Sequence, residues 1–172
     1  MTERVTTMPQ ADVLLVIDVQ NGLNQAAGYA ALVDRINERL DIYHDEDRPV
    51  IFMQHTDDTL PYGSDAWRLD ARLHRQTADT VFLKYHSDSF YETGLAERLH
   101  HILAESVEIC GLRTEYCVDT AFRVGHDRGF DMMTISGMST TFETPELPAA
   151  VIRRHHEGIW DGSFATVYPA MD

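Results

Sequence analysis

Short runs of apolar, often β-branched residues alternate with segments of helical periodicity along the chain, and this alternation most constrains the fold. The predicted strands are 13–17, 50–53, 80–84, 107–110, 132–135 and 165–168. Most of these runs are apolar without a polar alternation, which is typical of strands that are covered on both faces. The predicted helices are 29–40, 95–103, a segment that begins after Thr114, and 146–156.

Strand followed by helix, repeated, predicts an α/β fold. We expect a three-layer αβα architecture, in which a doubly wound, mainly parallel six-stranded sheet carries helices on both faces. The 172 residues fit a single domain that spans residues 1–172. The stretch 56–76 has little periodicity and contains Pro61 and Gly63. It is predicted to be a long loop, either a cover for a functional site or an irregular surface segment.

The charge balance narrows the class of partner. With 28 acidic and 14 basic residues the formal net charge is −14, so the surface should repel phosphate backbones and anionic membranes. We therefore expect a small-molecule substrate rather than nucleic acid or a membrane. Residues 1–12 lack a basic signal-peptide region and the apolar run 13–17 is too short to span a membrane. These features predict a cytoplasmic protein, in which Cys110 and Cys117 are free thiols.

The carboxyl ends of the predicted strands concentrate the chemically useful side chains. Ligands of open parallel α/β sheets bind beyond these ends. Asp18 follows the first strand, His55 the second, Lys84 closes the third, and Cys117 lies in the segment after the fourth. With Thr114 as the expected N-cap, Cys117 falls in the first turn of a helix, where the free N–H groups and the helix dipole favour a thiolate. Cys110, within a strand, is expected to be a buried apolar residue.

A thiolate nucleophile needs a proton acceptor, donors for the oxyanion and a balancing charge. Asp18 is the candidate acceptor and Lys84 the candidate balancing charge. Each residue has a structural alternative when it is taken singly, because Asp18 could cap a turn, Lys84 could reach from a strand end to solvent, and Cys117 could be a buried helix residue. Their joint occurrence at the strand ends of one sheet favours a catalytic set.

Three separated motifs, in order along the chain, resemble those of a known family. The first is Leu14-Leu15-Val16-Ile17-Asp18-Val19-Gln20-Asn21; the second is Phe82-Leu83-Lys84 with Ser89-Phe90 and Thr93-Gly94-Leu95; the third is Gly111-Leu112-Arg113-Thr114-Glu115-Tyr116-Cys117-Val118. On these motifs, which cover nearly the whole length, the chain resembles the isochorismatase-like cysteine hydrolases, a superfamily that includes nicotinamidases and N-carbamoylsarcosine amidase.

The resemblance implies a catalytic triad of Asp18, Lys84 and Cys117. It also implies a cis peptide between Leu112 and Arg113, with the backbone N–H groups of Arg113 and Cys117 forming the oxyanion hole. The implied reaction is cleavage of a C–N bond in a small amide, ureide or carbamoyl compound through a thioester, without a cofactor. A homodimer or higher homo-oligomer is implied as well.

The sequence also departs from named members of the superfamily. Nicotinamidases carry an Asp-x-His metal motif after the second strand, where this chain has Gln54-His55-Thr56-Asp57-Asp58, so we expect no metal. Gly22-Leu23 and Ser136-Gly137-Met138 also differ from common family patterns, which weakens the transfer of a substrate from any relative. Residues expected to contact substrate are Gln20, His55, Trp67 and Tyr116, with Phe142 as a further candidate for the pocket wall.

Two alternatives remain open from the sequence. One is a non-catalytic binding or scaffold protein that keeps the fold, because fold alone does not establish turnover. The other is an ester or vinyl ether hydrolase of the isochorismatase type, in which Cys117 is incidental. No Gly-x-Ser-x-Gly elbow, phosphate-binding glycine loop or Gly-x-Gly-x-x-Gly fingerprint occurs, so serine hydrolases and nucleotide enzymes are disfavoured.

Overall fold

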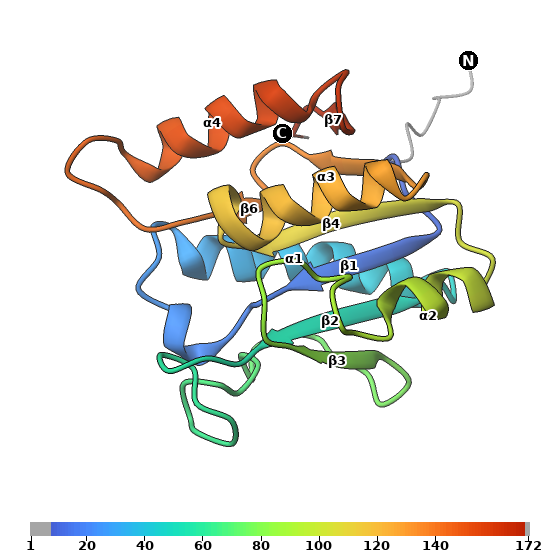
Figure 1. The fold of residues 1–172 in the computed structure, drawn as a ribbon, viewed down its shortest axis with the longest axis horizontal. Helices are drawn as coiled ribbons and strands as arrows, with labels where there is room; N and C mark the ends of the chain where they lie inside the picture. The colour runs from blue at the N-terminus through green and yellow to red at the C-terminus, as the bar shows by residue number, and fades with distance from the viewer. Residues whose placement is uncertain (1–7, 171–172) are drawn as a thin grey trace, which may run out of the picture.

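The computed structural model describes residues 8–170, and its centre is one parallel sheet (Figure 1). The strands follow the spatial order β3-β2-β1-β4-β5-β7, and β6 pairs with β4 beyond the end of β5. Their bounds are β1 Val13–Ile17, β2 Val50–His55, β3 Thr80–Lys84, β4 Ser106–Leu112, β5 Asp131–Ile135, β6 Ser139–Thr140 and β7 Thr166–Tyr168. All recorded strand pairings in this part of the chain are parallel.

The helices cover both faces of the sheet. They are α1 Tyr29–Asp45, α2 Leu95–His101, α3 Asp119–Asp127 and α4 Ala149–Trp160, with two short helical segments, η1 Asn21–Leu23 and the π-helical η2 Thr114–Val118. Figure 1 shows α1 behind the sheet and α2 and α3 in front of it. Across residues 8–170, no helix combines the length and the apolar character that crossing a bilayer requires.

Two apolar cores lie on opposite faces of the central strands. Alternate residues of β1 divide between them: Val13, Leu15 and Ile17 pack on the side of α2, α3 and Trp160, whereas Leu14 and Val16 pack on the side of α1. Every residue of β1 is buried, as expected of a strand with a neighbour on each edge and a helix layer on each face. The central position of β1 fixes the place of Asp18, which follows it directly.

The predicted α/β architecture is confirmed, and the sheet has one strand more than predicted. The six expected strands are all present, and the seventh, β6, is the two-residue strand Ser139–Thr140, too short to show a periodic pattern. The fourth helix begins at Ala149, not near 146, because Pro148 holds the extended N-cap conformation.

Gly111 allows β4 to pass close to β1 immediately before the functional residues. Its φ angle is +122°, outside the regions open to other residues. A Cβ atom at this position would overlap the carbonyl oxygen of Ile17, its register partner on β1. The close approach brings the end of β1, and hence Asp18, beside the segment that carries Cys117.

We expect Gly111→Ala to lower the free energy of unfolding by roughly 3 kcal/mol, because it adds both backbone strain and a steric overlap. Gly158→Ala is the matched control, since Gly158 is an exposed residue within α4 with open space at its Cβ position. This control substitution should raise the free energy of unfolding by about 0.5–1 kcal/mol. Urea denaturation of both variants measures the difference, and equal stabilities would contradict the role given to Gly111.

Candidate active site

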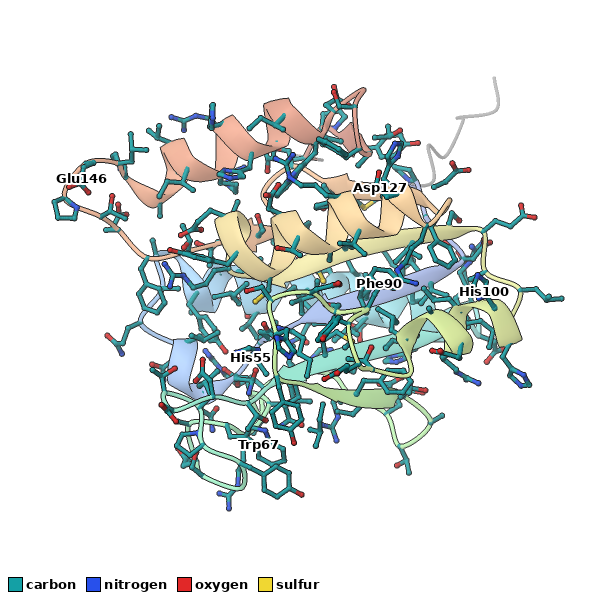
Figure 2. The ribbon with its side chains drawn as sticks, in the orientation of Figure 1. His55, Trp67, Phe90, His100, Asp127 and Glu146 are labelled. Atoms are coloured by element: carbon teal, nitrogen blue, oxygen red, sulfur yellow. The ribbon has the colours of Figure 1, made fainter. Side chains whose placement is uncertain are left out.

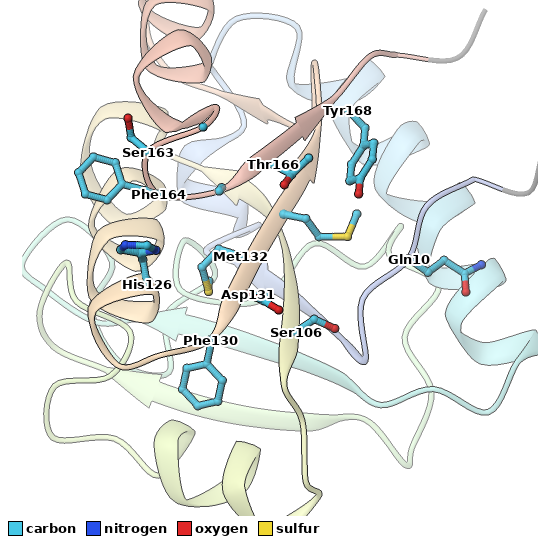
Figure 3. Close-up of a pocket in the computed structure, with 13 residues that line it drawn as sticks. Gln10, Ser106, His126, Phe130, Asp131, Met132, Ser163, Phe164, Thr166 and Tyr168 are labelled. Atoms are coloured by element: carbon cyan, nitrogen blue, oxygen red, sulfur yellow. The ribbon is translucent and has the colours of Figure 1, made fainter.

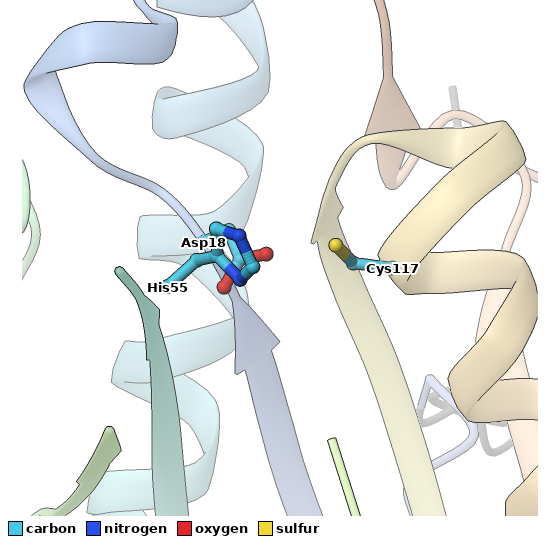
Figure 4. Close-up of side chains that lie close together, drawn as sticks. All are labelled: Asp18, His55 and Cys117. Carbon is cyan, nitrogen blue, oxygen red and sulfur yellow. The ribbon is translucent and has the colours of Figure 1, made fainter. Parts of the chain in front are cut away.

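Four neighbouring strands each deliver one side chain to a single point at the carboxyl edge of the sheet. Lys84 ends β3, His55 ends β2, Asp18 follows β1, and Cys117 lies in η2 after β4. Figure 4 shows Asp18, His55 and Cys117 at these strand ends. The three residues predicted as a catalytic triad are therefore brought together, with His55 beside them.

The Lys84 ammonium is the centre of the cluster, and its side chain is completely buried. Its Nζ lies 2.8 Å from Asp18 Oδ2, 3.1 Å from His55 Nδ1, 3.1 Å from the carbonyl oxygen of His86 and 3.3 Å from Cys117 Sγ. An ammonium has three protons to donate. These acceptors therefore more than satisfy the buried cation, and they hold it between the carboxylate and the sulfur.

Asp18 has one oxygen engaged and one free. Oδ2 pairs with Lys84, while the buried Oδ1 has no hydrogen-bond partner within the described residues. The backbone of Asp18 adopts a left-handed conformation, with φ at +53°, which is uncommon outside glycine and is concentrated at functional sites. A buried carboxylate oxygen without a donor is suited to accept a proton from a neighbouring group.

The backbone around Cys117 combines a confirmed and a corrected prediction. The predicted cis peptide between Leu112 and Arg113 is present. Thr114, however, is not the N-cap: it is the first residue of η2, its hydroxyl pairs with Ser139 Oγ, and the cap position is held by Arg113. The carbonyl of Arg113 accepts from the N–H groups of both Tyr116 and Val118. This wide first turn directs the Cys117 sulfur toward Lys84.

Burial and neighbouring charges determine the protonation of Cys117 and Lys84. They favour the thiol form of Cys117, in contrast to the thiolate expected from the helix dipole. Desolvation by burial, with the Asp18 carboxylate adding to it, raises the pKa of Cys117 to about 12, and Lys84 offsets only part of this rise. Burial would by itself lower the pKa of Lys84, but Asp18 and Cys117 outweigh it and the net pKa is raised. The resting site is therefore a neutral thiol beside an ammonium–carboxylate pair.

Cys117 opens into a small cavity of about 180 Å³. The cavity walls come from η1, the end of β2, the loop after it, the loop after β3 and η2. Its lining residues are Asp18, Leu23, His55, Asp57, Thr59, Leu60, Ser87, Arg113, Tyr116 and Cys117. Three of them belong to the 56–76 loop, so the start of this loop forms part of the cavity wall. Sequence reasoning missed Asp57, although its position two residues after a strand-end histidine was a usable signal.

Two of the residues expected to contact substrate lie elsewhere. The Gln20 side chain is buried and hydrogen-bonded to the backbone. Its Oε1 accepts from the N–H of His55, and its Nε2 donates to the carbonyls of His55 and Trp67. Trp67 donates from Nε1 to Thr56 Oγ1 and its ring packs on Tyr62, on the loop shown in Figure 2. Neither lines the cavity. The Gln20 side chain joins the end of β2 to the loop, and the Trp67 side chain packs within the loop itself.

His55 and Tyr116 do line the cavity, and Arg113 joins them at its wall. Tyr116 is half exposed. The Arg113 guanidinium lies 4.5 Å from the ring centre of Tyr116 and 5.0 Å from that of Phe142, and it pairs with Glu115 at 3.1 Å. From the sequence, Arg113 is expected to contribute only its backbone N–H to the site. In the structure Arg113 also belongs to the cavity wall, with its guanidinium beside Tyr116.

The donor atoms near Cys117 do not fit a divalent metal ion. One donor atom each from Asp18, His55 and Cys117 lies within 4.8 Å of the others, which is a spacing that a metal could use. All three residues, however, contact the Lys84 ammonium at 2.8–3.3 Å. A metal ion would have to share its ligands with a buried positive charge, so no catalytic step is assigned to one.

A second, larger groove lies near the amino ends of β4 and β5 and is shown in Figure 3. Its volume is about 550 Å³ and it is lined by residues that include Ser106, His126, Asp131 and Phe164. Neither Cys117 nor Lys84 borders it, and no cluster of nucleophile, base and cation is found among its lining residues. The smaller cavity at the carboxyl edge is therefore the candidate active site.

Comparison with known proteins gives a consistent family. The isochorismatase domain family matches residues 12–158. A solved isochorismatase family protein is 37% identical, with a TM-score of 0.87 over 90% of this chain and 96% of the other. The uncharacterized isochorismatase family protein YrdC of Bacillus subtilis is 25% identical over 144 residues, which are 78% of this chain and 76% of YrdC.

The fold is also shared with a solved nicotinamidase. The nicotinamidase SaPncA of Staphylococcus aureus is 17% identical, with a TM-score of 0.79 over 92% of this chain and 98% of SaPncA.

The pKa of Cys117 leads to a prediction about Asp18→Asn. Because the Asp18 carboxylate raises the pKa of the thiol and Lys84 lowers it, loss of the carboxylate should leave the lysine unopposed. The thiolate fraction at pH 8 should rise roughly tenfold for each unit by which the pKa falls. We expect faster alkylation of Cys117 by iodoacetamide, followed by mass spectrometry at fixed pH.

Lys84→Met provides the opposing control, because it removes the charge that stabilises the thiolate and should slow alkylation. Cys110 is fully buried with a raised pKa and should stay unmodified in every variant. Slower alkylation of Asp18→Asn than of the unchanged protein would show that the carboxylate does not oppose the thiolate.

Proposed function

The chain belongs to the isochorismatase family of hydrolases, and from its site we propose a cysteine-dependent enzyme that cleaves the C–N bond of a small amide, ureide or carbamoyl compound. The observation that carries the proposal is the contact of one buried ammonium, Lys84 Nζ, with both the Asp18 carboxylate and the Cys117 sulfur at a cavity. This arrangement supplies a nucleophile, a proton acceptor and a balancing cation within one site.

Acylation begins from the neutral thiol. Asp18 accepts the proton of Cys117 as the sulfur attacks the substrate carbonyl, so that a thiolate need not accumulate beforehand. The tetrahedral intermediate then collapses, the C–N bond breaks, and Asp18 returns the proton to the leaving nitrogen. Ammonia or an amine departs, and the acyl group stays on Cys117 as a thioester.

Deacylation uses the same carboxylate. Asp18 takes a proton from a water molecule, whose oxygen attacks the thioester carbonyl, and the C–S bond breaks. The proton held by Asp18 passes to the departing sulfur, which restores the thiol and releases a carboxylic acid or carbamate. The unpartnered Oδ1 of Asp18 supports its assignment as the atom that carries the proton in both half-reactions.

Negative charge on the carbonyl oxygen requires donors. We assign this role to the backbone N–H groups of Arg113 and Cys117, as the family resemblance implies. In the resting site the pKa of Lys84 is raised by Asp18 and Cys117, and the ammonium stabilises whichever of these two groups is negatively charged. The size of the cavity, about 180 Å³, supports a small substrate.

The nicotinamidase of similar fold supports amide cleavage on this scaffold, while the substrate of this chain is expected to differ. The two alternatives left open by the sequence predict different behaviour. An ester or vinyl ether hydrolase would turn over without using Cys117, and a binding protein would retain ligands without turnover.

Three further expectations from the sequence stay predictions. These are the single domain over residues 1–172, the homodimer or higher homo-oligomer, and the cytoplasmic location. The two free thiols, Cys110 and Cys117, are consistent with a reducing compartment.

Ammonia release from a panel of primary amides, ureides and carbamoyl compounds tests the proposal. Cys117→Ser should lower kcat/KM by roughly 10³-fold or more for any compound that is cleaved, because the hydroxyl is a much poorer nucleophile in a site built for sulfur. Mass spectrometry of the unchanged protein should detect an acyl adduct on Cys117.

Cys110→Ala is the matched control, because it removes the other thiol, which lies in a strand outside the cavity, and should leave turnover unaffected. Ammonia release that survives Cys117→Ser without an adduct would contradict Cys117 as the nucleophile, and cleavage confined to esters or vinyl ethers would favour the isochorismatase-type hydrolase. Binding of panel compounds without any hydrolysis would favour the binding protein.

A further inference from the structure

His55 links the buried charge cluster to an aspartate at the cavity wall. Its Nδ1 lies 3.1 Å from Lys84 Nζ, and its Nε2 lies 3.1 Å from Asp57 Oδ2. The His55 side chain is 15% exposed and that of Asp57 is 44% exposed. The chain of contacts therefore runs from the solvent-facing Asp57, through the imidazole, to the ammonium that touches Asp18 and Cys117.

The partners of His55 determine which ring nitrogen carries the hydrogen. An ammonium can only donate, and at 3.1 Å a hydrogen on Nδ1 would set two donors against each other, so Nδ1 is assigned as an acceptor without a hydrogen. The hydrogen then lies on Nε2, which donates to the Asp57 carboxylate. Asp57 is itself held in place, because its Oδ1 accepts from the N–H groups of Thr59 and Leu60 and from the Thr59 hydroxyl.

We propose that His55 is a positioning residue for Lys84, and that Asp57 sets the imidazole tautomer this role requires. The catalytic part of the inference depends on the proposed function, whereas the tautomer and its effect on Cys117 do not. His55 Nδ1 and the His86 carbonyl are two acceptors for Lys84 that keep the same protonation during the reaction. They hold the ammonium still while a proton moves between Cys117 and Asp18.

Asp57→Asn tests the tautomer directly. Oδ1 of the asparagine can still accept the Thr59 and Leu60 N–H groups, so its amide nitrogen replaces Oδ2 beside His55 Nε2. That nitrogen donates, which moves the ring hydrogen to Nδ1 and sets two donors, Nδ1–H and the Lys84 ammonium, against each other. We expect kcat/KM to fall roughly 10- to 100-fold, the loss of one hydrogen bond to a charged group. Alkylation of Cys117 should slow as well.

His55→Asn supplies the matched background. An asparagine at position 55 offers an amide oxygen near the place of Nδ1 and has no tautomers. Asp57→Asn should then add little further loss in the His55→Asn protein, although it is harmful in the unchanged protein. This dependence of one substitution on the other would not arise if Asp57 only stabilised its loop.

Asp41→Asn is the surface control, because Asp41 faces His74 at 2.9 Å and both side chains are about half exposed. It makes the same chemical change at a histidine–aspartate pair remote from the cavity lining, and turnover and alkylation should be unaffected. Nitrogen-15 NMR of the imidazoles reads the tautomer itself, with the His55 signals assigned by their loss in His55→Asn.

We expect a hydrogen on Nε2 of His55 in the unchanged protein. We also expect the effect of Asp57→Asn on turnover and alkylation to depend on the presence of His55. A hydrogen on Nδ1, or equal effects of Asp57→Asn in both backgrounds, would overturn the proposal. If no panel compound is hydrolysed, the proposed function fails, and the NMR and alkylation measurements still decide whether His55 positions Lys84.

Discussion

The site depends on a single buried ammonium. A lysine that is removed from water must be paired, and loss of one partner of a buried ion pair typically costs about 3–5 kcal/mol. Here the partner is Asp18, at 2.8 Å, and the sulfur of Cys117 lies on the same nitrogen at 3.3 Å. The ion pair with Asp18 that stabilises the buried Lys84 ammonium therefore also brings the candidate base, Asp18, next to the candidate nucleophile, Cys117.

The Lys84 ammonium lowers the pKa of Cys117 and the Asp18 carboxylate raises it. The balance of the two, together with burial, determines the form in which the cysteine rests. With Asp18 and burial prevailing, Cys117 rests as a thiol of raised pKa. Such a cysteine is protected from indiscriminate reaction with electrophiles, because the thiolate is the reactive form. In the proposed mechanism it becomes a nucleophile only when a bound carbonyl is in place and Asp18 takes the proton during attack.

Much of the fold and of the cluster could be predicted from sequence, because buried parallel strands are continuous apolar runs and their carboxyl ends meet at one edge. Strand-end position selected Asp18, His55 and Lys84, and the helical turn expected after the fourth strand selected Cys117. What sequence could not supply was side-chain direction and solvation. Gln20 follows Asp18 closely yet points into a backbone network, Thr114 pairs with a distant serine, and the raised pKa of Cys117 follows from burial that no local pattern records.

The order of the strands has a consequence for the folding of the chain. The cluster is built at four adjacent strands that lie in the order β3-β2-β1-β4. Their ends carry, in the same order, Lys84, His55, Asp18 and Cys117. The cluster draws on residues from Asp18 to Cys117, so its contacts join residues far apart in sequence, and contacts of this kind slow folding. Until these strands have paired, Cys117 has neither Asp18 nor Lys84 beside it. Assembly of the central strands is therefore what protects the thiol, because its raised pKa comes from burial and from the neighbouring Asp18.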